Sequence, residues 1–96
     1  MDNIVYLISL FDYYGDLLTD KQKEYFKDYY FRNLSLSEIS ENSHVSRHAV
    51  YKGLKETVNK LEVYERKLEL YKKGKKIKNL ISHLDNDLIE KINKLI

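Results

Sequence analysis

The side chains best suited to a chemical role lie together near the middle of the chain, and all of them are polar or basic. Arg47 can pair bidentately with the edge of guanine, and Lys52 and Lys55 can neutralise phosphates. His48 and Tyr51 can contact a base edge or pack against a sugar. These five residues therefore predict contact with DNA. The alternative interpretation is that they are only the solvated positions of an amphipathic helix.

The same sequence offers little to an enzyme or a metal. It has no cysteine, no glycine-rich phosphate loop and no serine with an evident base and orienting acid. His44 and His48 have the four-residue spacing of two helical metal ligands, but His44 is expected in a turn and no third ligand is near it in the sequence. We predict a protein that is not an enzyme, with no catalytic residue, metal or cofactor.

Helix-capping signals place the candidate DNA-contacting residues at the start of a recognition helix. Ser35 and Glu38 form a capping box that begins a short helix, and Ser46 is suited to cap the next one. His44 occupies the intervening turn, where a positive φ favours glycine but histidine is tolerated better than most residues. This is the pattern of a helix-turn-helix, whose buried positions would be Ile39, Val45, Val50 and Leu54.

Two further helices are expected before this motif. Apolar residues at spacings of three and four predict a first helix that ends near Gly15. Thr19 and Gln22 form a capping box for a second helix, which should end near Asn33. The inward stripe of that second helix would be Tyr25, Phe26, Tyr29 and Tyr30. The chain has nine tyrosines, and six of them could also stack on RNA bases: Tyr13, Tyr25, Tyr29, Tyr30, Tyr64 and Tyr71. Packing in the core and at an interface is the preferred interpretation.

The recognition helix is expected to continue well past its DNA-reading turns. A heptad seam predicts one helix as far as Lys73, through Leu54, Thr57, Leu61, Tyr64, Leu68 and Tyr71. Gly53 costs this helix about 1 kcal/mol relative to alanine, which implies either a close backbone approach or a loose turn. Surface pairing with neighbouring basic residues is expected for the acidic side chains Glu56, Glu62, Glu65 and Glu69.

A tail is expected after Gly74, which interrupts the apolar pattern. It would form one final helix, or two short helices broken near Asp85. The division of the chain is therefore residues 1–73, a helix-turn-helix domain with an extended recognition helix, and residues 74–96, a tail that packs on the domain or on a second subunit. The heptad seam should meet that tail or a second copy, and a homodimer is the preferred prediction.

Composition and charge agree with a small all-α protein. The 96 residues contain no proline and three glycines, and no segment alternates as a strand does. Residues 44–78 carry a net charge of +7, against −4 before them and −1 after them, so the middle of the chain is suited to a polyanion. The basic run 66–78 either binds phosphate or is simply solvated. No basic leader or long apolar run is evident, so we expect a cytoplasmic protein with no membrane contact.

Several short motifs resemble one known family of DNA-binding proteins. They are Phe11-Asp12-Tyr13-Tyr14, Leu17-Leu18-Thr19-Asp20-Lys21-Gln22, Leu36-Ser37-Glu38-Ile39 and Val45-Ser46-Arg47-His48-Ala49-Val50-Tyr51. Over residues 1–73 the chain is similar to the YlxM family, whose helix-turn-helix resembles region 4 of sigma-70-type factors.

This resemblance implies a trihelical, sigma-region-4-like head and a regulatory or accessory role in the signal recognition particle pathway. It supports Arg47, Tyr51 and Lys52 as residues of the recognition helix. The expected partner is DNA, and RNA or protein components of the particle are further candidates. The competing interpretation is an adaptor that binds protein or RNA without reading a DNA sequence.

Overall fold

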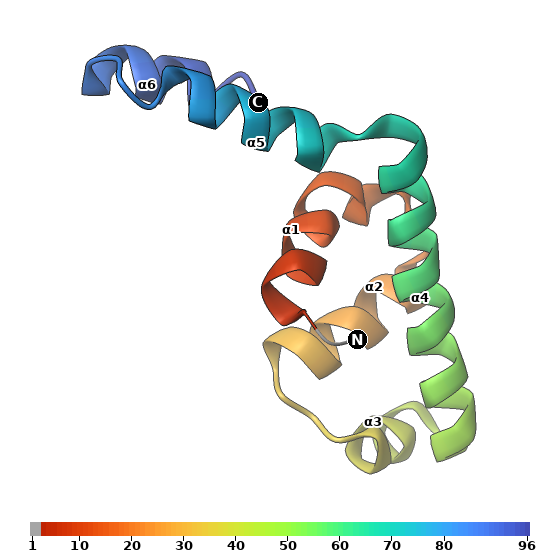
Figure 1. Ribbon diagram of the computed structural model, residues 1–96. Coiled ribbons are helices and arrows are strands. Elements are labelled where there is room, and N and C mark those ends of the chain that lie inside the picture. Colours follow the sequence, from red (N-terminus) through yellow and green to blue (C-terminus); the bar gives the residue numbers. More distant parts are fainter. Residues whose placement is uncertain (1–2) are drawn as a thin grey trace.

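The computed structural model describes residues 3–96, and the regular elements of that part of the chain are all helical. The order is α1 (Ile4–Tyr14), η1 (Gly15–Leu17), α2 (Asp20–Phe26), η2 (Lys27–Phe31), α3 (Leu36–Ser43), α4 (Arg47–Leu68), α5 (Leu70–Ile81) and α6 (Asn86–Asn93). Figure 1 shows α1, α2 and α3 stacked along one side of α4, while α5 and α6 leave its far end. The predicted all-α helix-turn-helix fold is confirmed.

Helix α4 is the spine of the head, because α1, α2 and α3 all pack against it. Its apolar side chains Val50, Leu54 and Leu61 have no exposed surface. The opposing helices supply further fully buried residues, among them Leu10, Tyr14, Phe26 and Ile39. Fully burying a side chain of this size contributes roughly 1.5–3 kcal/mol, so this single layer of contacts holds the head together.

The heptad seam on α4 was expected to meet the tail or a second copy, and that expectation is wrong for most of its length. Leu54, Thr57 and Leu61 are fully buried within the head itself. At the far end of the seam, Tyr71 makes an edge-on contact with Tyr6 of α1, with 5.2 Å between the ring centroids. The 3.5-residue spacing is a property of helix packing inside one chain as much as between two.

Both predicted capping boxes form. The Gln22 amide donates to Thr19 Oγ1 over 3.2 Å, and Gln22 Oε1 accepts from the Thr19 amide over 3.0 Å. The Ser35 and Glu38 pair has the same reciprocal geometry, with distances of 3.0 and 3.1 Å. The Ser35 amide, which donates to the Glu38 carboxylate, lowers the pKa of that carboxyl. These bonds satisfy N–H groups that a helix start leaves without partners, and so they set where α2 and α3 begin.

Helix α2 ends in the widened π-helical turn η2, which the sequence did not predict. The Arg32 amide donates to the Lys27 carbonyl five residues back over 2.9 Å, and Asn33 then closes the segment with a φ of 56°. The predicted end near Asn33 is confirmed. So is most of the inward stripe, because Tyr25, Phe26 and Tyr30 are buried and Tyr29 is half-buried.

The long helix predicted to reach Lys73 in fact ends at Leu68. Glu69 adopts a φ of 55°, and α5 then starts in a new direction. Glu65 holds this bend: its carboxylate accepts from the amides of Tyr71 and Lys72, each over 3.1 Å, and from the Tyr14 hydroxyl over 2.6 Å. The expectation that Glu65 pairs on the surface is therefore wrong, since its carboxylate is buried and caps α5.

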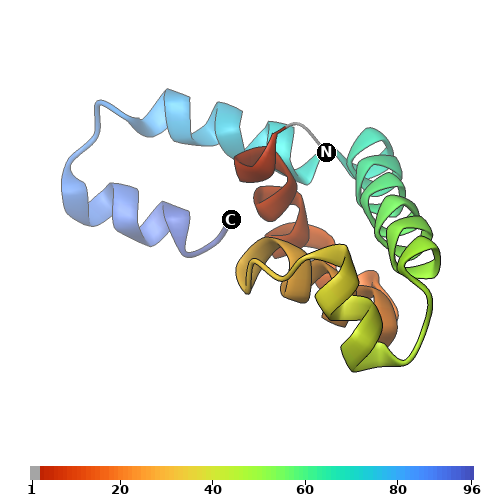
Figure 2. The same ribbon diagram turned by 90° about the horizontal axis from the view of Figure 1, so that it is seen from below.

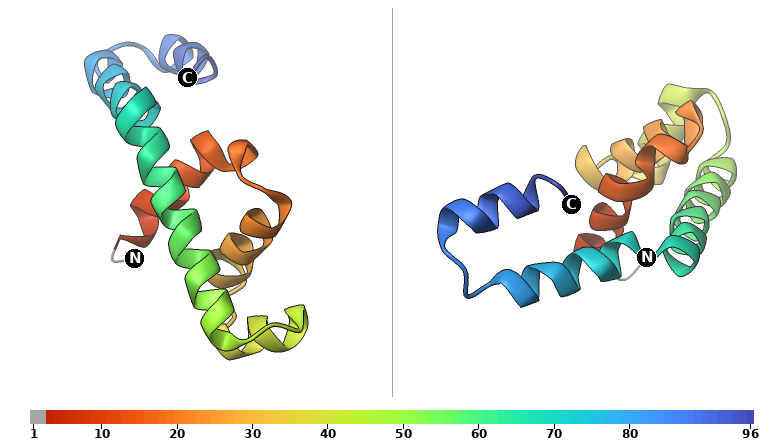
Figure 3. Two further views of the ribbon diagram at one scale, coloured as in Figure 1. Left: turned by 90° about the vertical axis from the view of Figure 1, so that its right-hand side faces the viewer. Right: turned by 90° about the horizontal axis from the view of Figure 1, so that it is seen from above.

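Gly74 does not interrupt a helix, contrary to the prediction, but lies inside α5. A Cβ at this position would overlap the Tyr13 hydroxyl, so the missing side chain lets α5 rest closely on α1. The break expected near Asp85 is confirmed, because Asp85 caps α6 through the Leu88 amide over 3.0 Å. Helix α6 then turns back beside α5, and the C-terminal end points toward α1 (Figures 2 and 3). The predicted division between residues 73 and 74 thus falls within α5.

Candidate nucleic-acid interface

The turn between α3 and α4 has the geometry that a helix-turn-helix requires. His44 is left-handed, with φ 57° and ψ 37°, and its amide donates to the Ser40 carbonyl. Ser46 then caps α4, because its hydroxyl accepts from the Ala49 amide over 3.0 Å. Of the four positions predicted to be buried, Ile39, Val50 and Leu54 are fully buried and Val45 is half-buried. The short turn and these buried side chains together fix the angle between α3 and α4.

All five residues predicted to contact DNA are exposed on the first turns of α4. Arg47, Tyr51 and Lys55 follow one another at four-residue intervals and share one stripe, and His48 and Lys52 flank it. The Lys55 ammonium lies 5.8 Å from the centroid of the Tyr51 ring, within range of a cation–π contact. The structure thus brings the five residues together on one surface, which we call the recognition surface.

The recognition surface is free of the chain's own tail. Helices α5 and α6 lie at the opposite end of α4 in Figure 1. Within residues 3–96, Arg47, Lys52 and Lys55 form no ion pair with a carboxylate. Two acidic residues border the surface: Glu56 lines a hollow with Lys52, and Glu62 lines another with Lys55. The basic groups therefore remain available for an external anion.

Gly53 marks a close contact between α2 and the part of α4 that carries the recognition surface. A Cβ on Gly53 would lie 2.8 Å from Cε2 of Tyr25, so the ring of α2 rests directly on the α4 backbone. The nearby Thr57 hydroxyl donates to the Gly53 carbonyl over 2.8 Å. Of the two sequence interpretations of Gly53, the close approach is the one observed. The glycine itself was a signal in the sequence, but nothing in the sequence identified Tyr25 as its partner.

The described part of the chain contains no cluster of three or more histidine, cysteine or acidic side chains arranged for a metal ion. His44 lies in the turn and His48 on the exposed face of α4, as their sequence positions predicted. Among residues 3–96, no helix has the length and apolar character needed to span a bilayer.

Comparison with known proteins gives one consistent family. The family model described as "Putative helix-turn-helix protein, YlxM / p13 like" matches residues 1–96. A UPF0122 protein of Caldanaerobacter subterraneus subsp. tengcongensis is 45% identical over 83 residues, which are 86% of this chain and 71% of that protein. A UPF0122 protein of Fusobacterium nucleatum is 40% identical over 97 residues, covering 100% of this chain and 94% of its own length. A third, from Listeria welshimeri, is 46% identical over 85% of this chain and 74% of its own length.

Proposed function

We propose that this chain, which belongs to the YlxM / p13-like family of helix-turn-helix proteins, binds duplex DNA through the first turns of α4. One observation carries the proposal: Arg47, Tyr51 and Lys55 form an exposed stripe at the start of α4, a capped helix that follows a left-handed turn. A helix presented in this way fits the major groove, where its first residues reach base edges. Arginine would read guanine, and the lysines would contact phosphate.

The proposed role is regulatory, and the family resemblance points to the signal recognition particle pathway as its setting. We propose a cytoplasmic location, because the protein would meet either partner, the DNA or the particle, in the cytoplasm. The exposed basic groups serve recognition in this proposal, and they carry no catalytic step. The competing function is that of an adaptor, in which the same surface binds a protein or the RNA of the particle without discriminating between DNA sequences.

The test begins with selection of preferred duplexes from a random library, followed by fluorescence anisotropy on the selected and a scrambled duplex. Arg47→Ala should weaken binding to the selected duplex by roughly 5-fold to 150-fold, the loss of about 1–3 kcal/mol expected for one bidentate base contact. Lys52→Ala should weaken both duplexes alike and lower the salt slope by about 0.9. Lys91→Ala is the control, because Lys91 is also an exposed basic residue but lies on α6, outside the basic run 66–78.

A selected duplex that binds no tighter than the scrambled one would reject sequence reading and favour the adaptor. The same measurement with a stem-loop RNA then separates an RNA adaptor from a protein adaptor. Equal losses from Arg47→Ala and Lys91→Ala would also contradict the proposal, because they would show a general charge effect.

We also propose a homodimer, since a two-fold pair of recognition helices matches paired half-sites in DNA. Most of the seam that first suggested dimerisation packs within the head, so the proposal now depends on this symmetry argument. Static light scattering at micromolar concentration measures it directly: the monomer has a mass of 11.5 kDa, and a dimer has twice that. A monomer mass for the free protein, together with one protein copy per duplex in the complex, would exclude the homodimer.

A further inference from the structure

Helix α5 presents a second basic surface, at the other end of α4 from the recognition surface. Its lysines are Lys72, Lys73, Lys75, Lys76 and Lys78, and all are exposed. Residues 70–84 contain no acidic residue at all. Within residues 3–96 the lysines of α5 have a single ion pair, a long one of 3.9 Å between Lys72 and Glu69. This density of positive charge is higher than at the recognition surface.

The other side of α5 is already occupied, which determines the kind of polyanion that fits. Gly74 rests on Tyr13 of α1, and α6 packs against α5, where Ile77 and Ile81 are half-buried. Leu70 and Leu80 stay exposed, but they lie near opposite ends of the helix and form no continuous apolar face. A helix that binds a lipid surface needs such a face to insert. The free side of α5 instead offers charge without an apolar wedge, which suits the phosphate backbone of a nucleic acid.

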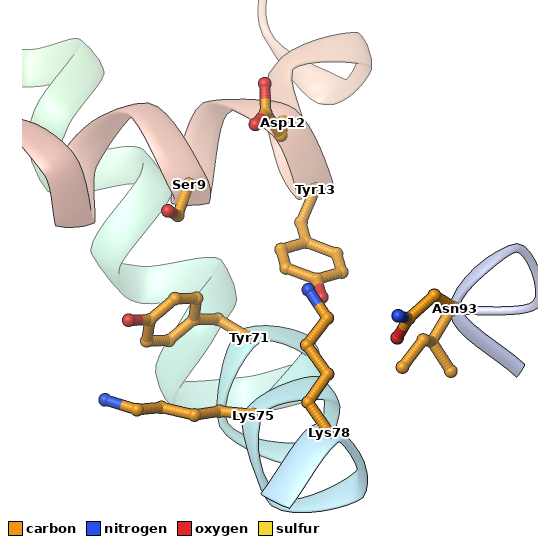
Figure 4. A pocket seen from close by; sticks show the side chains of 8 residues that line it. Ser9, Asp12, Tyr13, Tyr71, Lys75, Lys78 and Asn93 are labelled. Atoms are coloured by element: carbon orange, nitrogen blue, oxygen red, sulfur yellow. The ribbon is translucent and has the colours of Figure 1, made fainter. Parts of the chain in front are cut away.

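A hollow between α1 and α5 extends this basic surface toward the head (Figure 4). Tyr13 and Ser9 line it from α1, and Tyr71, Lys75 and Lys78 line it from α5. Figure 4 shows the Lys78 side chain extending from α5 toward Tyr13. The Lys75 ammonium lies 6.0 Å from the centroid of the Tyr71 ring. The Ser9 hydroxyl already donates to the Val5 carbonyl over 2.9 Å, so the donors left for a phosphate are the tyrosine hydroxyls and the two ammonium groups. Among residues 3–96, Asp12 is the one acidic side chain that lines the hollow.

The lysines are also spaced for a backbone. Lys72 and Lys76 are four residues apart, so they are separated by about 6 Å along one side of the helix. Lys73, three residues before Lys76, lies on the same side. Helix α4, with its 22 residues, separates this surface from Arg47 by about 33 Å. Figure 1 shows α5 leaving on the side of α1, away from the start of α4. The two basic surfaces are therefore independent of each other.

We infer that the lysine side of α5, with the hollow beside it, is a second binding surface for nucleic-acid phosphates that acts without regard to sequence. It goes beyond the proposed function, because it would operate whether or not α4 reads DNA. A protein with two such surfaces can hold two segments of nucleic acid at once, one at each end of α4.

The test uses the full chain with two matched double variants. Lys73→Gln with Lys76→Gln removes two charges from α5, and Lys91→Gln with Lys94→Gln removes two exposed charges from the α6 end of the tail. Affinities for a random-sequence duplex DNA and for a stem-loop RNA are measured by anisotropy between 50 and 200 mM salt. Circular dichroism confirms that each variant keeps its helices. Each variant is also made in the Arg47→Ala background.

The α5 variant should lower the slope of log affinity against log salt by about 1.8 on duplex DNA, the loss of two phosphate contacts, and the α6 variant should leave the slope unchanged. The same difference should persist with Arg47→Ala. A loss on DNA alone or on RNA alone identifies which backbone the surface takes, and either supports the inference. Unchanged slopes on both nucleic acids, or equal losses in the two double variants, would overturn it. If the α5 variant has no effect while Arg47→Ala still weakens binding to the selected duplex, this inference fails and the proposed function stands.

Discussion

The Tyr14 hydroxyl is the most informative single group to remove from this structure. It donates to Glu65 Oε1 over 2.6 Å and accepts from the Leu70 amide over 2.9 Å, so it joins α1 to the bend between α4 and α5. A hydrogen bond to a charged group contributes about 1.5–3 kcal/mol. This bond from the Leu70 amide is only partly buried and Leu70 is 42% exposed, so water can replace the acceptor that the amide loses. Tyr14→Phe should therefore lower the free energy of unfolding by about 2 kcal/mol.

Two measurements check this value. Urea unfolding followed by circular dichroism gives the free energy directly, and in a domain of this size the melting temperature should fall by about 8–16 °C. Amide hydrogen exchange gives the local effect: the Tyr71 and Lys72 amides donate to Glu65, so they should lose more protection than amides in α3.

Tyr13→Phe is the matched control, because it deletes the same hydroxyl from the neighbouring residue, where residues 3–96 provide no hydrogen-bond partner. A cost below about 0.5 kcal/mol for Tyr14→Phe would refute the reasoning, and so would equal costs for the two variants. A double-mutant cycle with Glu65→Gln adds a further check, since groups in direct contact should couple by about 0.5–3 kcal/mol.

Three further predictions follow from the backbone and the buried tyrosines. Gly53→Ala should destabilise the fold by about 1–2 kcal/mol, because the added Cβ meets the Tyr25 ring. In a Tyr25→Ala background the same change should stabilise the fold by up to about 1 kcal/mol. Thermal melts that show stabilisation in both backgrounds would contradict this. His44→Gly should raise the melting temperature by a few degrees, because a left-handed residue with a Cβ costs about 1–2 kcal/mol, and a decrease would show that the imidazole stabilises the turn. Burial raises the pKa of both Tyr14 and Tyr30 to about 12. The stability that these two groups contribute is therefore complete below pH 10 and is lost as the pH rises through 12. Replacing both by phenylalanine should make the urea midpoint of unfolding less dependent on pH over that range.

The helix-turn-helix could be predicted from the sequence because every signal for it is local. The capping boxes join residues three apart, His44 adopts the positive φ that its place in the turn required, and the apolar spacing placed Ile39 and Val50 inside. The exposure of Arg47 followed from the same periodicity. Interactions within one helical turn are written in consecutive residues, so a single sequence displays them.

The bend and the tail could not be predicted, because they depend on partners far away in the chain. Glu65 looked like one member of a charged surface row, and only its contact with Tyr14, 51 residues earlier, makes it a buried cap. Gly74 looked like a helix end, and only the Tyr13 hydroxyl explains it as a packing site. The apolar spacing continues through Tyr71 without a break, so it cannot show that Glu69 turns the backbone. Such contacts require the tertiary fold to be known first.

The projecting pair α5 and α6 also changes how the molecule moves through solvent. Its Cα radius of gyration is 16.2 Å with principal extents of 51 × 25 × 23 Å, whereas a compact chain of this length would have a radius of about 12–13 Å. A rod-like particle meets more friction than a sphere of the same mass, so it elutes early from a sizing column and sediments slowly. A single copy will therefore mimic a heavier species in chromatography.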